Sequence, residues 1–296
     1  MKFKNIRYLL ETPFIWFGLL FFRLFSPENA SMIGAKIALT IHYFLKNKLS
    51  VNKLAYDNLS QAMPELNPQQ KQQIIADMWD NFGRIIAEFI HICKMDKNQL
   101  ANFVSIDEQT SQNIENLRAS SKGGIIFSAH YGNWEIGPKI LMQNGLKVKT
   151  IYRPLNNPYA ENLTAKIRNV EMIAKGSAGN REIINAIKNN EFVIIMADQK
   201  ITDGEPIKFF NRDAITSTSI AKIAMKYNVP IIPGYISRIE KNFKFKLTIE
   251  KPLTINLTSN FGENIKNITL QINQIVEKWI RKSPHQWFWV HNRWKK

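Results

Sequence analysis

The stretch Gly124-Ile125-Ile126-Phe127-Ser128-Ala129 is the segment of the sequence that decides the fold. It is short, almost entirely apolar and rich in isoleucine, which is typical of a strand covered on both faces. His130 follows it directly, and polar residues after a buried strand commonly stand on a loop at its carboxyl end. We therefore expect an inner strand here, in a layered α/β domain.

The sequence around this strand alternates between strand-like and helical runs, which favours a central mixed sheet flanked by helices. Further buried strands are expected at residues 148–152, 191–197 and 229–236. The alternating run FKFKLTIE at residues 243–250 predicts a half-exposed edge strand. Helices are expected at residues 180–189, 217–227 and 264–281, and throughout 58–100, where Asn67 is the expected cap before Pro68.

The first part of the chain is hydrophobic and distinct from the rest. Residues 13–22, PFIWFGLLFF, are continuously apolar, but Glu11 precedes them and Arg23 follows. Counted outward from Tyr8 to Phe25, the segment is near the lower limit for a membrane span, with these charges towards its ends. One weak span, a helical hairpin lying in the membrane interface, and a buried helix pair all stay open. We expect residues 1–48 to be a membrane anchor or interfacial helices, and 49–296 to be the main domain.

The charge balance points to acidic partners without choosing among them. Lys and Arg number 40 against 24 Asp and Glu, a net charge of +16. Nucleic acid, an anionic membrane face, or an acidic protein or phosphorylated substrate would each suit this charge. The aromatic residues gather at the two chain ends beside basic residues, which favours lipid, whereas nucleic acid is supported by charge alone.

The cysteine and histidine content limits the kinds of disulfide, metal site and active site that the chain can form. Cys93 is the single cysteine, which excludes an intramolecular disulfide and a thiolate cluster, and we expect it to be a core thiol. The five histidines form no i, i+4 pair, so no metal site is predicted. The glycine patterns of a serine nucleophile, a phosphate loop and a dinucleotide site are missing from the sequence, and no cofactor is predicted.

His130 and Glu135 form the candidate catalytic pair. If Asn133 caps the helix that follows, Glu135 falls in its first turn and can fold back towards the imidazole. A carboxylate bonded to one ring nitrogen leaves the other free to take a proton, which is base chemistry without a covalent nucleophile. Gly132 would let a substrate approach the backbone closely. A histidine engaged in a helix-cap contact is the competing interpretation.

A resemblance extends this interpretation. Residues 128–135, SAHYGNWE, resemble the His-x4-Asp/Glu motif of the lysophospholipid acyltransferase superfamily, and more narrowly the bacterial late acyltransferases of lipid A biosynthesis. Further segments resemble blocks of that family in order: Tyr152-Arg153-Pro154, Asn157-Pro158, Arg168, Ala197-Asp198-Gln199, Pro230-Ile231-Ile232-Pro233 and residues 284–295, PHQWFWVHNRWK. Residues 200–206 and Asn292 depart from the usual pattern, which bears on acceptor and chain length.

The resemblance implies a glycerolipid acyltransferase-like fold and a reaction. A fatty acyl group would pass from acyl carrier protein, a co-substrate, to a hydroxyl of a phosphorylated lipid A precursor at the cytoplasmic face of the inner membrane. His130 would be the general base and Glu135 its orienting partner. Arg153 and Arg168 would bind phosphate or the oxyanion, and Asp198 would lie near the site. A glycerophospholipid or another glycolipid is the alternative acceptor.

Overall fold

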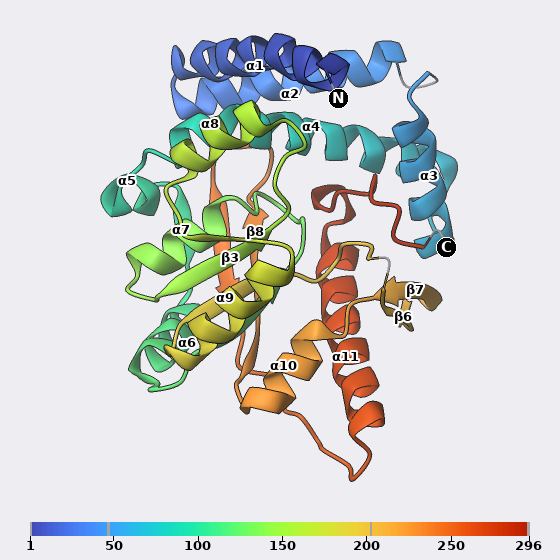
Figure 1. Ribbon diagram of the computed structural model, residues 1–296. Helices are drawn as coiled ribbons and strands as arrows, with labels where there is room; N and C mark the ends of the chain where they lie inside the picture. Colours follow the sequence, from blue (N-terminus) through green and yellow to red (C-terminus); the bar gives the residue numbers. More distant parts are fainter. Residues whose placement is uncertain (1, 46–47, 202, 295–296) are drawn as a thin grey trace.

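The central sheet of the protein has seven strands and is mixed. The computed structural model describes residues 2–45, 48–201 and 203–294. In sheet order the strands are β1 (Val104–Ile106), β9 (Phe245–Ile249), β8 (Ile231–Arg238), β2 (Gly124–Ser128), β5 (Phe192–Met196), β3 (Val148–Tyr152) and β4 (Met172–Ala174). Neighbouring strands are parallel except for the antiparallel pair β8 and β9. This confirms the expected α/β class with a mixed sheet flanked by helices (Figure 1).

Strand β2 lies in the middle of the sheet, between β8 and β5, as its unbroken apolar sequence predicted. Its side chains alternate between two hydrophobic clusters. Ile125 and Phe127 belong to one cluster and Ile126 to the other. The strands expected at 148–152, 191–197 and 229–236 are confirmed as β3, β5 and β8.

The expectation that residues 243–250 form an edge strand is wrong. Strand β9 pairs with β8 on one side and with β1 on the other, so both of its edges are used. Its alternating burial is as expected, because Phe245, Leu247 and Ile249 are buried and the residues between them are half-exposed. An alternating sequence reports which face of a strand is covered and carries no information about its hydrogen-bonded edges.

Helices cover both faces of the sheet (Figure 1). They are α1 (Lys2–Arg23), α2 (Pro27–Leu45), α3 (Ser50–Ala62), α4 (Pro68–Ile92), α5 (Lys97–Ala101), α6 (Glu108–Ala119), α7 (Ile136–Gln143), α8 (Pro158–Arg168), α9 (Ser177–Lys188), α10 (Ser219–Tyr227) and α11 (Phe261–Lys282). A hairpin of β6 (Glu205–Phe209) and β7 (Arg212–Thr216) lies outside the main sheet. The Asn67 cap is confirmed, because Asn67 and Gln70 form a reciprocal capping box.

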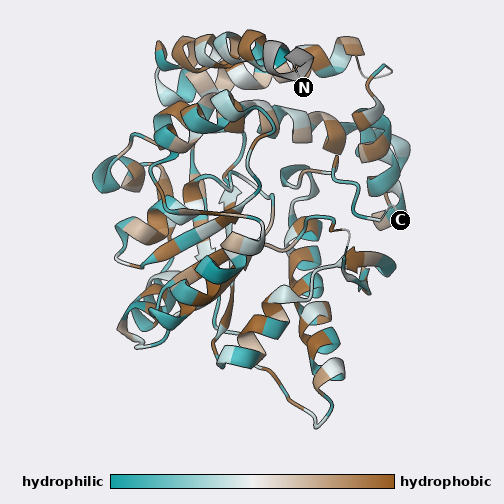
Figure 2. Cartoon of the chain, in the orientation of Figure 1, coloured by the Kyte–Doolittle hydropathy of each residue, from teal (hydrophilic) through white to brown (hydrophobic). Residues whose placement is uncertain are grey.

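The two N-terminal helices lie over α4 at one end of the molecule (Figure 1). Helix α2 packs closely on α4 at Gly34 and Gly83, where a Cβ on either glycine would collide with the carbonyl oxygen of the other. Within residues 2–45, 48–201 and 203–294, no helix is both long enough and apolar enough to cross a membrane. Several apolar side chains in this part of the chain are nevertheless exposed, among them Phe14 with 79% and Leu24 with 81% of their surface. Figure 2 shows hydrophobic residues along both N-terminal helices.

The C-terminal segment is buried, contrary to the lipid contact that its aromatic composition suggested. Trp287 and Trp289 are 0% exposed and Arg293 is 1% exposed. Asn58 of α3 donates hydrogen bonds to the carbonyl oxygens of Trp289 and His291, at 2.9 and 2.8 Å, which fix the segment to the helical layer. Lys295, the last residue of the C-terminal motif, lies outside the described residues.

Candidate active site

His130 and Asp198 meet because they follow neighbouring parallel strands. His130 comes two residues after β2 and Asp198 two residues after β5, so both stand at the same edge of the sheet. His130 Nδ1 is 2.9 Å from Asp198 Oδ1, and the backbone N–H of His130 donates to Asp198 Oδ2 at 2.8 Å. The carboxylate therefore fixes the ring and its backbone together.

The electrostatics of this pair favour a base at the other ring nitrogen. Burial alone would raise the pKa of Asp198, but the charge and hydrogen bonds of His130 outweigh it and hold that pKa below its usual range. An ionised carboxylate accepts the Nδ1 proton of His130, which leaves Nε2 with a lone pair. Nε2 lies 3.3 Å from the side-chain nitrogen of Gln199.

The C-terminal segment completes the support of this pair. The indole N–H of Trp287 donates to Asp198 Oδ2 at 2.8 Å. The backbone N–H of Phe288 donates to the His130 carbonyl at 3.2 Å, and that of Gly132 to the Gln286 carbonyl at 2.9 Å. Sequence reasoning did not assign Trp287 to the site. The position of the tryptophan-rich block in the family order was the signal that could have suggested it.

Glu135 is paired with Arg168, and the carboxylate bonded to the His130 ring is that of Asp198, which corrects the pairing expected from the sequence. The Glu135 carboxylate binds the guanidinium of Arg168, with Nε to Oε2 at 2.9 Å and Nη2 to Oε1 at 3.1 Å. Residues 133–135 form a turn before α7, and the Glu135 side chain leaves it towards the end of α8, where Arg168 is the last residue. Burial works against the charge of Arg168, but the Glu135 carboxylate outweighs it and raises the pKa of the guanidinium.

A cavity of about 170 Å³ collects most of the candidate residues. His130, Glu135, Arg153 and Arg168 all line it, and Asp198 lies behind the His130 ring. Arg153 is exposed, whereas the Glu135–Arg168 pair is mostly covered. The cavity thus brings an imidazole and two guanidinium groups together, and guanidinium groups suit an anionic ligand.

The loop that carries His130 rests on buried polar groups. Glu88 of α4 is 0% exposed and accepts hydrogen bonds from Asn133 of the loop at 2.7 Å, Ser31 of α2 at 2.6 Å and Arg238 of β8 at 2.6 and 2.9 Å. Gly132 has a φ of +59°, and a side chain there would collide with the carbonyl oxygen of Ile236. The glycine therefore makes room for β8 and not for a substrate.

His291 is a second histidine that sequence reasoning did not place in the site. Its ring centroid lies 4.8 Å from that of His130. Burial, followed by the charge of His130, lowers the pKa of His291 to about 4, so its ring is neutral near pH 7. The nitrogen and oxygen donors of His130, Asp198 and His291 lie within 4.8 Å of one another, a spacing that could hold a metal ion. Because His130 Nδ1 and Asp198 Oδ1 already bond each other, we interpret the group as a base and its supports.

Cys93 stands apart from this chemistry. The thiol is buried at the end of α4, and burial raises its pKa to about 12. A thiol with so high a pKa is a poor nucleophile at neutral pH. The expectation of a core thiol is confirmed.

Comparison with known proteins identifies the family to which the chain belongs. Residues 1–296 match the family of bacterial lipid A biosynthesis acyltransferases, and the chain belongs to that family. It is therefore an acyltransferase of lipid A biosynthesis, an enzyme of the EC 2.3.1 type.

Curated relatives of the chain carry related activities. It is 23% identical to the lipid A biosynthesis palmitoleoyltransferase of Escherichia coli (strain K12), over 99% of this chain and 94% of the relative. It is 22% identical to the lipid A biosynthesis lauroyltransferase of the same organism, over 82% of this chain and 78% of the relative. The crystal structure of the 1-acyl-sn-glycerophosphate acyltransferase PlsC from Thermotoga maritima aligns with 90% of this chain and all of that one, with a TM-score of 0.40 and 15% identity.

Proposed function

We propose that the protein transfers a fatty acyl group from acyl carrier protein to a hydroxyl of a phosphorylated lipid A precursor, with His130 as the general base. His130 Nε2 takes the hydroxyl proton while the hydroxyl oxygen attacks the thioester carbonyl carbon. The new C–O bond forms, the C–S bond breaks, and the thiolate of the carrier's prosthetic group leaves with a proton returned by His130. No electrons are gained or lost, and no cofactor is required.

The hydrogen-bonded pair of His130 and Asp198 is the observation that carries the proposal. Asp198 holds Nδ1 at 2.9 Å, which directs Nε2 to accept the proton and stabilises the imidazolium that forms. We assign to Asp198 the orienting role that the sequence gave to Glu135. Glu135 would instead hold Arg168, at 2.9 Å, beside the reacting groups.

The arginines supply the proposed phosphate and oxyanion contacts. Arg153 and Arg168 line the same cavity as His130, and a guanidinium binds phosphate with two parallel hydrogen bonds. Arg168 already donates to Glu135, so Arg153, which is exposed, is the better candidate for the acceptor phosphate. The names of the Escherichia coli relatives, a palmitoleoyltransferase and a lauroyltransferase, support a fatty acyl donor.

We further propose that residues 1–48 lie in the membrane interface at the cytoplasmic face of the bacterial inner membrane, with 49–296 as the acyltransferase domain. Support comes from the exposed apolar side chains of α1 and α2, which include Phe14 and Phe17 at 79% and 63% exposure. Such faces bind at the boundary of headgroups and acyl chains, and a net charge of +16 favours anionic lipid and an acidic carrier protein.

The test is acyl transfer by purified protein in detergent or liposomes, with acyl carrier protein thioester and a lipid A precursor. His130→Ala should lower kcat/KM by about 10²–10⁴-fold and Asp198→Asn by at least a hundredfold, because each removes the oriented base. Asp203→Asn, on the exposed loop that follows, is the matched control and should retain activity. Near-normal transfer by folded His130→Ala would refute the base assignment, and transfer only to a lysoglycerophospholipid would refute the acceptor.

A further inference from the structure

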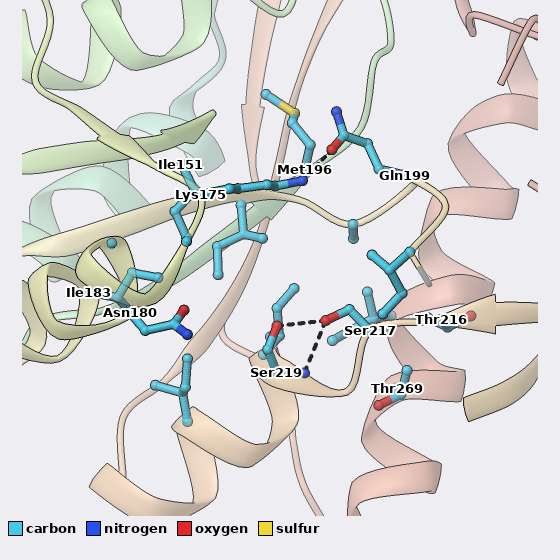
Figure 3. A pocket seen from close by; sticks show the side chains of 18 of the residues that line it. Ile151, Lys175, Asn180, Ile183, Met196, Gln199, Thr216, Ser217, Ser219 and Thr269 are labelled. Atoms are coloured by element: carbon cyan, nitrogen blue, oxygen red, sulfur yellow. Dashed lines mark hydrogen bonds between the residues drawn. The ribbon is translucent and has the colours of Figure 1, made fainter. Parts of the chain in front are cut away.

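Gln199 belongs to a chain of hydrogen bonds that runs from Lys175 to Asp198. The Lys175 ammonium donates to the side-chain oxygen of Gln199 (Figure 3). The side-chain nitrogen of Gln199 lies 3.3 Å from His130 Nε2, and His130 Nδ1 lies 2.9 Å from Asp198 Oδ1. Lys175 directly follows β4 and Gln199 comes shortly after β5, so the chain forms at the carboxyl edge of the sheet, where His130 also stands.

The charged groups at the two ends of this chain fix the direction of every hydrogen bond in it. Lys175 has only donors, so the Gln199 side chain turns its oxygen towards Lys175 and its NH2 group towards His130. The ionised Asp198 carboxylate only accepts, so the neutral imidazole carries its proton on Nδ1. A Gln199 N–H therefore donates to the lone pair of His130 Nε2, the atom that takes the proton in the proposed reaction.

The Gln199 amide occupies the place that the acceptor hydroxyl needs. A hydroxyl that gives its proton to His130 Nε2 must lie about 2.6–3.2 Å from that atom. The amide nitrogen, at 3.3 Å, has to give way to it. The displaced N–H then lies beside the carbonyl group that the hydroxyl oxygen attacks, and an amide N–H is a suitable donor to the oxygen on which negative charge develops.

Other donors near His130 are already engaged. In the loop that carries it, four backbone N–H groups have acceptors within the protein, those of residues 130, 131, 132 and 135. Arg168 uses two of its guanidinium nitrogens to bind Glu135. The Gln199 amide differs from these groups, because the arriving hydroxyl takes its acceptor and so releases an N–H next to the reacting carbon.

We propose that Gln199 donates a hydrogen bond to the thioester carbonyl oxygen and stabilises the oxyanion, while Lys175 orients and polarises the Gln199 amide. The inference rests on the proposed acyl transfer and adds a donor to the arginine contacts. As the new C–O bond forms, the π electrons of the carbonyl move onto its oxygen, and they return when the C–S bond breaks. Gln199 is then a catalytic residue, because it touches the reacting oxygen, and Lys175 is a positioning residue.

The first test removes the amide. Gln199→Ala should lower kcat by about 10²–10³-fold and change KM for the thioester by less than about threefold, because the contact forms in the transition state. Gln199→Glu keeps the shape but loses the N–H groups, and should lose at least as much activity. Gln112→Ala removes an exposed amide from α6, is the matched control and should keep kcat. Wild-type kcat in folded Gln199→Ala would overturn the proposal.

The role of Lys175 is tested by rescue. Lys175→Met keeps an unbranched side chain but removes the donor, so the amide is free to turn and kcat should fall by about tenfold. Lys175→Arg restores a charged donor and should recover most of the lost kcat. Equal losses in the two variants would show that Lys175 does not orient the amide.

A binding measurement distinguishes the oxyanion contact from a structural role. It uses two phosphopantetheine probes, an alkyl thioether without the carbonyl and a phosphonate whose anionic oxygens mimic the tetrahedral intermediate. Calorimetry should show that Gln199→Ala weakens binding of the phosphonate by about a hundredfold and that of the thioether by less than about threefold. An equal loss for both probes would overturn the proposal, because a distorted cavity would affect them alike.

The same readouts separate this inference from the proposed function. If the wild type transfers acyl groups and Gln199→Ala transfers them equally well, the oxyanion role is wrong and the proposed function stands. If the wild type transfers nothing to a lipid A precursor while Gln199→Ala still weakens binding of the phosphonate alone, the oxyanion role stands and the proposed acceptor is wrong.

Discussion

The two ends of the chain are alike in composition and opposite in position. Both combine tryptophan and phenylalanine with basic residues. Helix α1 leaves Trp16 46% and Phe17 63% exposed, whereas the C-terminal segment buries Trp287 and Trp289 completely. The C-terminal segment supports the candidate pair, because the Trp287 indole donates to Asp198 and the Phe288 backbone N–H donates to the His130 carbonyl. Aromatic content therefore identifies a segment that must bury apolar surface, and the rest of the fold decides whether protein or lipid covers it.

The two ends of the chain should differ most in their contribution to the free energy of unfolding. Trp287→Ala should lower the free energy of unfolding by about 3–5 kcal/mol, because it empties a packed site and leaves Asp198 with one donor fewer. Trp16→Ala, the same substitution in α1, should change it by less than about 0.5 kcal/mol. Chemical denaturation of both variants in detergent measures the difference, and equal losses would contradict the contrast between the two ends.

The N-terminal end should instead dominate binding to lipid. Phe14→Ser with Phe17→Ser should weaken partition into anionic liposomes by roughly a hundredfold, because each phenylalanine contributes about 1.5 kcal/mol on entering the interface. Phe261→Ser, at the exposed start of α11, is the matched control. Liposome sedimentation at physiological salt gives the partition. A double variant that still partitions like the wild type would show that another surface binds the membrane.

The smallest predicted effect is a pH dependence carried by His291. The pKa of this histidine is about 4 when folded and about 6.5 when unfolded, so between these values the unfolded chain binds a proton that the folded chain refuses. Stability should therefore fall as pH drops from about 6.5 towards 4. His291→Gln should remove about 2 kcal/mol of the loss measured between pH 7.5 and 5. Urea unfolding at both pH values tests this, and an unchanged pH dependence would argue against a buried neutral ring.

The strands and the position of His130 could be predicted from the sequence because their signals are local. An unbroken apolar run predicted β2, and a polar residue directly after it predicted the position of His130. The partner of His130 could not be predicted in this way. Asp198 is 68 residues away and reaches the ring only because β5 pairs with β2. Proximity in the sequence favoured Glu135 as the partner of His130. In the structure, the Glu135 carboxylate instead binds Arg168.

Contacts between residues far apart in the sequence also explain the other differences between the expected and the observed structure. The pairing of β9 with β1 depends on a short strand about 140 positions earlier, which carries too few residues for a periodic signal. The indole of Trp287 and the ring of His291 belong to the last segment of the chain. They contact Asp198 and His130, which are far away in the sequence. The periodicity of apolar residues predicts single helices and strands. It does not predict which distant segments meet to form a site.

The buried carboxylate of Glu88 also bears on how this protein can be shortened. Ser31 of α2 donates a hydrogen bond to one of its oxygens, and Asn133 of the loop that carries His130 donates to the other. A chain starting at Ser50 would take away Ser31 and uncover the surface of α4 at Gly83, so a charged group would lose one of its donors and water could reach it. Truncation for easier purification should accordingly loosen the loop that holds His130, and full-length protein in detergent is the better sample.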